Sequence, residues 1–90
     1  MKILQTRTFA NQVKKLHTNQ KNDLDEAIRE IIDDLFIGKP KKGDLNGVSV
    51  YKFKMTKQLT LLAYEYDSSN NQLTLLALGS HENFYRDLKH

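Results

Sequence analysis

The sequence predicts an α+β fold in which two N-terminal helices pack on an antiparallel β-meander. Apolar residues in the first part of the chain recur with helical spacing, at i, i+3, i+4 and i+7. From residue 50 to residue 78 they follow strand patterns, and clusters of turn-forming residues separate the segments. The chain has 90 residues with no internal repeat or linker, so we expect one domain spanning residues 1–90.

The first helical stripe is short. Phe9, Val13 and Leu16 stand at i, i+4 and i+7, and Thr8 has a side chain suited to the N-cap position. The segment Lys2–Thr6 before it is expected to form a short edge strand. The first helix is therefore predicted to begin directly after Thr8.

The second helical stripe is longer and broader. Asp23 and Glu26 match an acidic form of the capping box, so the helix is predicted to begin near Asp23. The polar segment His17–Asn22 before it is expected to contain the bend between the helices. The apolar positions of the stripe are Leu24, Ala27, Ile28, Ile31, Ile32 and Leu35.

A loop with three glycines and one proline leads to the first strand of the meander. In that strand Tyr51, Phe53 and Met55 are expected to face the helices, because alternate side chains of a strand point to opposite faces. This alternation sends Lys52 and Lys54 to the other face of the sheet.

Two further strands are predicted at Gln58–Tyr66 and Gln72–Leu78, joined by a polar hairpin loop at 67–71. Both strands carry apolar residues on both faces, so the face away from the helices is expected to be covered by the C-terminal segment or by a partner. The tail contains the adjacent aromatic residues Phe84 and Tyr85. We expect the tail to fold back over the sheet as a helical turn, with Phe84 as its anchor.

Composition excludes several classes of protein. The chain has no cysteine, which excludes disulfides and thiolate metal sites and suits a cytoplasmic protein. Its apolar runs are far shorter than a membrane span, and no secretory leader is expected. His17, His81 and His90 lie far apart in sequence, and neither a phosphate-binding glycine loop nor a GxSxG motif is present. We therefore expect no metal and no cofactor.

The charges are segregated along the chain. Residues 23–34 hold six acids and one base, whereas residues 39–57 hold six lysines and one acid, within a net charge of +3. Such polarity can orient a protein toward a polyanion, although two ordinary solvated faces produce the same pattern. The basic residues that we single out as candidate contacts to a polyanion such as RNA are Lys39, Lys41, Lys42 and Lys57.

Lys52 and Lys54 are the first candidates for chemistry. Two ammonium groups roughly 6–7 Å apart on one strand face suit contact with a phosphate backbone. Lysines on a strand face also keep a sheet soluble and guard it against edge pairing, and the residues alone do not separate these alternatives.

The tail supplies three more candidates. His81 has the side chain best suited to proton transfer near neutral pH, but a loop histidine can also serve only to bond the backbone. Tyr85 could stack on a nucleobase. Arg86 could clamp a phosphate, or it could pair with Glu82 four residues earlier.

Together these segments resemble the RelE/ParE superfamily of toxins from type II toxin–antitoxin systems. The resemblance covers nearly the whole chain, from the two helices through the loop at 43–47 to the tail. Residues 51–55 (Tyr-Lys-Phe-Lys-Met) are similar to the lysine strand of RelE-type ribosome-dependent mRNA interferases. Residues 79–85 are similar to the Gly-Thr-His-x-x-x-Phe ending of YafQ-type interferases. Residues 61–64 (Leu-Leu-Ala-Tyr) and 79–85 (Gly-Ser-His-Glu-Asn-Phe-Tyr) also look like a ParE-like subfamily.

The resemblance implies an endoribonuclease that cuts mRNA in the ribosomal A site and is held inactive by an antitoxin. It assigns Lys52 and Lys54 the role of base or phosphate stabiliser, His81 the role of acid or base, and Tyr85 the role of stacking on a base. Arg86 as a phosphate clamp is suggested by its chemistry alone. An antitoxin segment is expected to bury the apolar patches of this small core and to present acids to the lysines.

The sequence also departs from both interferase patterns. RelE-type enzymes carry an arginine in the strand that corresponds to Leu59–Tyr64, where this chain has no basic residue. YafQ-type enzymes use further histidines upstream, and none occurs here between residues 18 and 80. The alternative function is that of a ParE-type toxin, a non-enzymatic inhibitor of DNA gyrase. A binding module without toxicity is a third reading.

Overall fold

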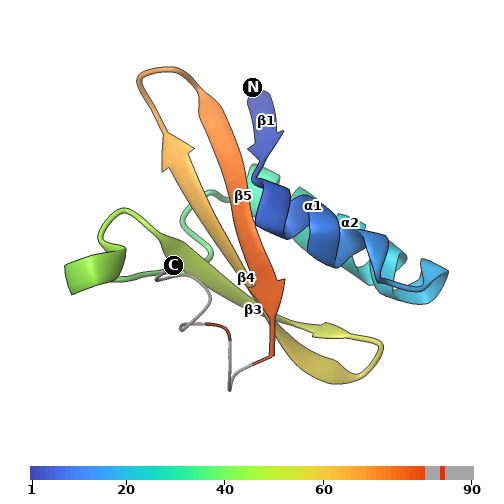
Figure 1. Ribbon diagram of the computed structural model, residues 1–90. Coiled ribbons are helices and arrows are strands. Elements are labelled where there is room, and N and C mark those ends of the chain that lie inside the picture. The colour runs from blue at the N-terminus through green and yellow to red at the C-terminus, as the bar shows by residue number, and fades with distance from the viewer. Residues whose placement is uncertain (81–83, 85–90) are drawn as a thin grey trace.

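The structure of the chain is a computed structural model that describes residues 1–80 and residue 84. It confirms the α+β class, with two N-terminal helices on one face of a five-stranded mixed sheet (Figure 1). No helix in this part of the chain is long and apolar enough to cross a membrane. The elements in chain order are β1 (Lys2–Gln5), α1 (Arg7–Lys14), α2 (Thr18–Asp33), β2 (Lys39–Pro40), a 3-10 turn (Gly43–Leu45), β3 (Ser49–Met55), β4 (Gln58–Asp67) and β5 (Gln72–Gly79).

The sheet has the strand order β1-β5-β4-β3-β2. Strands β3, β4 and β5 form the predicted antiparallel meander, and the short strand β1 pairs in parallel with β5 at one edge. At the other edge β2 pairs with only two residues of β3, Val50 and Ser49. This stretch was predicted to be a loop from its glycines and Pro40, but proline is tolerated on an edge strand.

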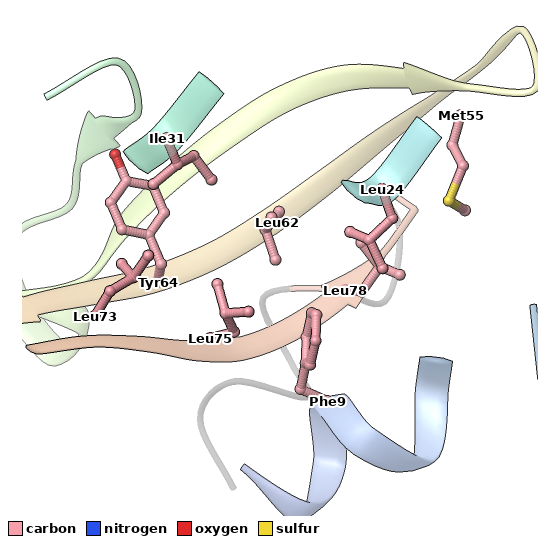
Figure 2. Packing of buried hydrophobic residues seen from close by; sticks show 9 residues of the cluster. All are labelled: Phe9, Leu24, Ile31, Met55, Leu62, Tyr64, Leu73, Leu75 and Leu78. Carbon is pink, nitrogen blue, oxygen red and sulfur yellow. The ribbon is translucent and has the colours of Figure 1, made fainter. Parts of the chain in front are cut away.

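The face of the sheet that the helices cover holds the larger apolar cluster (Figure 2). The predicted stripes of both helices are confirmed, since Phe9 of α1 and Leu24 and Ile31 of α2 are buried there against the sheet. Tyr51 and Phe53 pack against this cluster from β3, as their alternation predicted. The sheet residues at the centre of the cluster are Met55, Leu62, Tyr64, Leu73, Leu75 and Leu78.

The opposite face of the sheet, called the outer face below, carries a second and smaller cluster. Its members are Val48, Val50, Leu61, Ala63, Ala77 and Phe84. Phe84 is 2% exposed, so this residue of the C-terminal segment covers the outer face, as the sequence predicted. Gly79 lies next to Phe84, since a Cβ atom there would be in ordinary van der Waals contact with Cδ1 of Phe84, at 3.4 Å. The rest of the predicted helical turn lies outside the described residues.

The helices begin earlier than predicted. Thr6, not Thr8, is the N-cap of α1: its hydroxyl accepts a hydrogen bond from the Phe9 amide at 3.1 Å and donates one to the Leu76 carbonyl at 2.6 Å. Thr8 therefore lies in the first turn of α1. The hydrogen bond to β5 favours Thr6 as the N-cap, and this contact could not be predicted from the residues around Thr6.

The start of α2 is also corrected. The helix begins at Thr18, with His17 as N-cap and a hydrogen bond from the His17 amide to Oε1 of Gln20 at 2.8 Å. Asp23, predicted to be the cap, lies inside the helix. Its Oδ2 accepts a hydrogen bond from the Thr56 amide at 2.7 Å, and so ties α2 to the turn between β3 and β4.

Replacing Thr6 with alanine is expected to lower the free energy of unfolding by about 1–2 kcal/mol, because the N-cap bond and the bond to β5 are lost together. Urea denaturation of the purified chain measures this change. Thr8→Ala is the matched control. It removes the same side chain from an exposed helical position, so stability should stay within about 0.5 kcal/mol. Equal losses for the two variants would contradict the assignment of the cap.

Candidate functional site

The two candidate lysines of β3 lie on the outer face, as predicted. Val50, two residues before Lys52 on the strand, belongs to the outer cluster, and Lys52 and Lys54 continue the same alternation. Both lysines are exposed, and neither forms an ion pair with another described residue. Lys52 pairs across the ladder with Leu61, which lies in the same cluster as Phe84. The lysine strand and the anchor of the C-terminal segment therefore share one face of the sheet.

The other predicted basic residues divide into two groups. Lys39 pairs with Val50 in the β2–β3 ladder, and together with Lys41 and Lys52 it borders one pocket at this edge of the sheet. Lys42 stands just before the 3-10 turn, and Lys57 occupies the tight turn between β3 and β4. The fold thus places Lys39, Lys41 and Lys52 around this pocket, and Lys42 and Lys57 are not among the residues that line it.

Three predicted site residues, His81, Tyr85 and Arg86, lie outside the described residues. Phe84, their neighbour in sequence, is described and is buried on the outer face. Within residues 1–80 and 84, no group of three or more acidic, histidine or cysteine side chains is placed to hold a metal ion.

The β4 residues that face the same way as the lysines are apolar. Leu59 is 51% exposed beside Lys54, and Leu61 and Ala63 are buried under Phe84. Strand β4 has no basic residue, so the exposed side chain that it presents beside Lys54 is the apolar Leu59.

On the side of β3 that faces the helices, Tyr51 contacts Glu30, an interaction that was not predicted from the sequence. Tyr51 donates a hydrogen bond from its hydroxyl to Oε2 of Glu30 on α2, and its ring stacks on Phe53 with a centroid distance of 6.2 Å. The hydrogen bond to Glu30, followed by burial and the nearby negative charge, raises the pKa of Tyr51 to about 12. No local sequence signal pairs these residues, which are 21 positions apart and meet only when α2 packs on the sheet.

This contact makes stability depend on pH in the alkaline range. An unfolded tyrosine titrates near pH 10, whereas folded Tyr51 keeps its proton to about pH 12. The stabilisation by this contact is therefore complete below pH 10 and is lost as pH rises toward 12, because only the unfolded chain releases the proton in that interval. We expect Tyr51→Phe to lose less stability than the parent chain between these pH values, as measured by urea denaturation.

A second variant separates the carboxylate from the rest of the environment. In Glu30→Gln the charge is removed and an acceptor remains, so the absorbance titration of Tyr51 should move back toward pH 10. An unchanged tyrosine titration in Glu30→Gln would show that Glu30 does not hold the proton on Tyr51.

Comparisons with known proteins agree on one family. Residues 3–89 match the family model for the ParE-like toxin of type II bacterial toxin–antitoxin systems. No curated protein matches the sequence.

Solved structures show the same fold at low sequence identity. One is a chain of the intact E. coli RelBE toxin–antitoxin complex, with 16% identity over 90% of this chain and 96% of that chain and a TM-score of 0.71. A second is the YoeB/ParE toxin from Agrobacterium tumefaciens, with 20% identity over 90% and 99% of the two chains and a TM-score of 0.70. A third is a chain of the RelBE2 toxin–antitoxin complex from Mycobacterium tuberculosis, with 19% identity over 89% and 96% and a TM-score of 0.60.

The family match spans nearly the whole chain. The chain also has the fold of the RelE and YoeB/ParE toxins. The resemblance to the RelE/ParE superfamily is thereby confirmed. The chain belongs to the ParE-like toxins of type II bacterial toxin–antitoxin systems.

Proposed function

We propose that this toxin is an endoribonuclease that cleaves mRNA on the ribosome and so arrests translation. The observation that carries the proposal is the shared outer face of Lys52, Lys54 and Phe84. Phe84, which is buried beside the lysine strand, lies in sequence between the candidate for proton transfer, His81, and the candidate for base stacking, Tyr85.

The proposed reaction is an attack by an RNA 2′-hydroxyl on the adjacent phosphorus. The bond from phosphorus to the 5′-oxygen breaks, which leaves a 2′,3′-cyclic phosphate and a 5′-hydroxyl. One group must take the proton of the 2′-hydroxyl, and another must give a proton to the leaving 5′-oxygen. Lys52 and Lys54 are suited to stabilise the negative charge that builds on the phosphate, and His81 is the candidate for proton transfer.

The proposed partner is a cognate antitoxin in the cytoplasm. Two similar structures are toxin–antitoxin complexes, so a protein of this fold is known to be bound in this way. For this chain, an acidic antitoxin segment would complement the basic surface of β2 and β3.

A second candidate function is inhibition of DNA gyrase without catalysis. The composition of β4 favours it, because this strand has no basic residue that could share the phosphate charge with Lys52 and Lys54, and it presents the exposed Leu59 beside Lys54 instead. Under this reading Lys52 and Lys54 would bind a partner without acting on RNA.

Induced expression followed by mapping of mRNA 5′ ends distinguishes the two functions. The endonuclease reading predicts new 5′ ends within translated codons soon after induction. Intact mRNA together with accumulated gyrase–DNA cleavage complexes would refute it in favour of gyrase inhibition, and normal growth would leave only a binding module.

A further inference from the structure

The loop between β2 and β3 contains the dipeptide Asn46-Gly47. The chain has seven asparagines, and Asn46 is the one that a glycine follows. In such a pair the backbone nitrogen of the glycine can reach the side-chain carbonyl carbon of the asparagine, because the second residue has no Cβ atom to block the approach. The dipeptide is therefore a candidate for a chemical modification of the main chain.

The dipeptide occupies the two central positions of a type II β-turn. The φ and ψ angles of Asn46 are −57° and 132°, and φ of Gly47 is +91°. The Val48 amide closes the turn with a hydrogen bond of 3.0 Å to the Leu45 carbonyl. Glycine accepts either sign of φ, so the central peptide group is able to rotate and turn the Gly47 nitrogen toward the Asn46 side chain.

Both reacting groups of the dipeptide are accessible. The loop projects from the sheet, away from the two helices, and Asn46 and Gly47 are exposed (Figure 1). A Cβ atom placed on Gly47 would meet no other atom within 4 Å. The Asn46 carboxamide and the Gly47 amide make no hydrogen bond to another residue in the described part of the chain, so neither group must first be released from a partner.

Two asparagines of the β4–β5 hairpin provide an internal comparison. Asn70 and Asn71 are as exposed as Asn46, but each is followed by a residue with a side chain. Their carboxamides are also held in place. Nδ2 of Asn70 donates to Asp67 at 2.7 Å, and Oδ1 of Asn71 accepts from the Tyr66 hydroxyl at 3.0 Å. Residue 46 therefore combines exposure with a following glycine and a carboxamide that no described residue holds.

We propose that Asn46 deamidates spontaneously and that its product loosens the outer cluster. The Gly47 nitrogen loses its proton to hydroxide and attacks Cγ of Asn46, which forms a C–N bond and a five-membered imide. The side-chain NH2 group takes a proton from water and leaves as ammonia. Water then opens the imide at either carbonyl. Attack at Cγ gives aspartate, whereas attack at the main-chain carbonyl of residue 46 gives isoaspartate, in which the main chain runs through the former side chain.

The isoaspartate product lengthens the main chain by one carbon atom inside the turn. Leu45 packs against the outer cluster just before the turn, and Val48, which is 7% exposed, belongs to the cluster just after it. The Val48 carbonyl also accepts a hydrogen bond from the Lys41 amide at 2.8 Å. The extra atom changes the spacing between Leu45 and Val48, so the cluster should pack less tightly.

Incubation of the full-length chain in buffers of increasing pH tests the reaction. Peptide mapping by mass spectrometry locates the conversion of amide to acid, and enzymatic methylation of isoaspartate labels the longer product. Both signals should appear first at residue 46 and form faster at higher pH, because hydroxide removes the Gly47 proton. Asn46→Ser should abolish them, and Gly47→Ala should slow them several-fold, because a Cβ atom hinders the attack.

A synthetic peptide of residues 43–49 is the matched reference, because it has the same sequence without the fold. No conversion at residue 46 of the folded chain while this peptide is converted would overturn the proposal, since the fold would then protect the turn. Equal conversion at residues 46, 70 and 71 would also overturn it.

Urea denaturation tests the effect on the outer cluster. Asn46→Asp adds the same charge without lengthening the main chain, so its midpoint should equal that of the parent at this exposed position. The aged chain enriched in isoaspartate should unfold at a lower urea concentration. Equal midpoints for the aged and parent chains, or the same loss in Asn46→Asp, would refute the loosening of the cluster. These measurements need neither RNA nor a partner, so their outcome is independent of the proposed function.

Discussion

Cells that express the Lys52→Ala, Lys54→Ala double variant are expected to grow normally, whereas the parent toxin arrests growth. In the proposed reaction, the two exposed ammonium groups on the outer face stabilise charge on the phosphate in the transition state. Loss of one such preorganised charge or donor typically slows a reaction by about 10²–10³, or roughly 2.7–4 kcal/mol. Removing both should bring mRNA cleavage below the level that halts translation, as measured by 5′-end mapping and by growth after induction.

A matched control is available on the same chain. The Lys14→Ala, Lys21→Ala double variant lowers the net charge by the same amount, but both residues are exposed on the helices, which cover the other face of the sheet. It should still arrest growth and cut mRNA. If the two double variants were equally inactive, general charge attraction to the polyanion would explain the effect, and a specific role for Lys52 and Lys54 would be excluded.

The elements that the sequence predicted well are those with a long internal pattern. The stripe predicted for the second helix has six apolar positions, five of them within α2, and the alternation in β3 runs without interruption, so burial alone determines which side faces the core. This is why the outward direction of Lys52 and Lys54 could be predicted before the fold was known. The polar hairpin loop between β4 and β5 was similarly clear, and the Ser69 amide donates to Oδ1 of Asp67 within it.

The errors arose where a distant contact decides a local choice. Thr6 and Thr8 are equally good caps by residue type, and only the bond from Thr6 to the Leu76 carbonyl distinguishes them. Asp23 was assigned to a helix start, but its carboxylate serves the Thr56 amide, 33 positions away. Local residue propensities cannot predict such pairs, because the sequence around each partner carries no sign of the distant contact.

The site was predictable only in part for the same reason. The lysines of β3 carry a pattern, whereas the pocket joins Ile37 to Val50 and Tyr51 across a chain reversal. Its one local signal is an apolar pair, Phe36 and Ile37, that continues past the end of the α2 stripe into a polar loop. The contact between Glu30 and Tyr51 likewise exists only after α2 has packed on the sheet.

Replacing Phe84 with alanine is expected to lower the free energy of unfolding by about 3–5 kcal/mol, the usual cost of removing a buried phenylalanine. Phe84 is 2% exposed and packs against Leu61, Ala63 and Ala77, which would become exposed without it. A small domain has a total stability of only about 5–15 kcal/mol, so this loss is a large fraction of the whole. Urea denaturation and the thermal midpoint measure it.

The same residue tests whether the segment must be anchored for activity. Phe36→Ala is the control for stability, because that ring is 89% exposed and its removal should change the free energy of unfolding by less than about 0.5 kcal/mol. Phe84→Leu keeps an apolar side chain and should cost less than about 1.5–2 kcal/mol, so the chain stays folded. If Phe84 positions the segment with His81 and Tyr85, Phe84→Leu should fold almost normally yet cleave mRNA more slowly than the parent. If Phe84→Leu is less stable but cleaves mRNA as fast as the parent, Phe84 has only a structural role. The rate of cleavage would then not depend on how tightly this side chain packs beside Lys52 and Lys54.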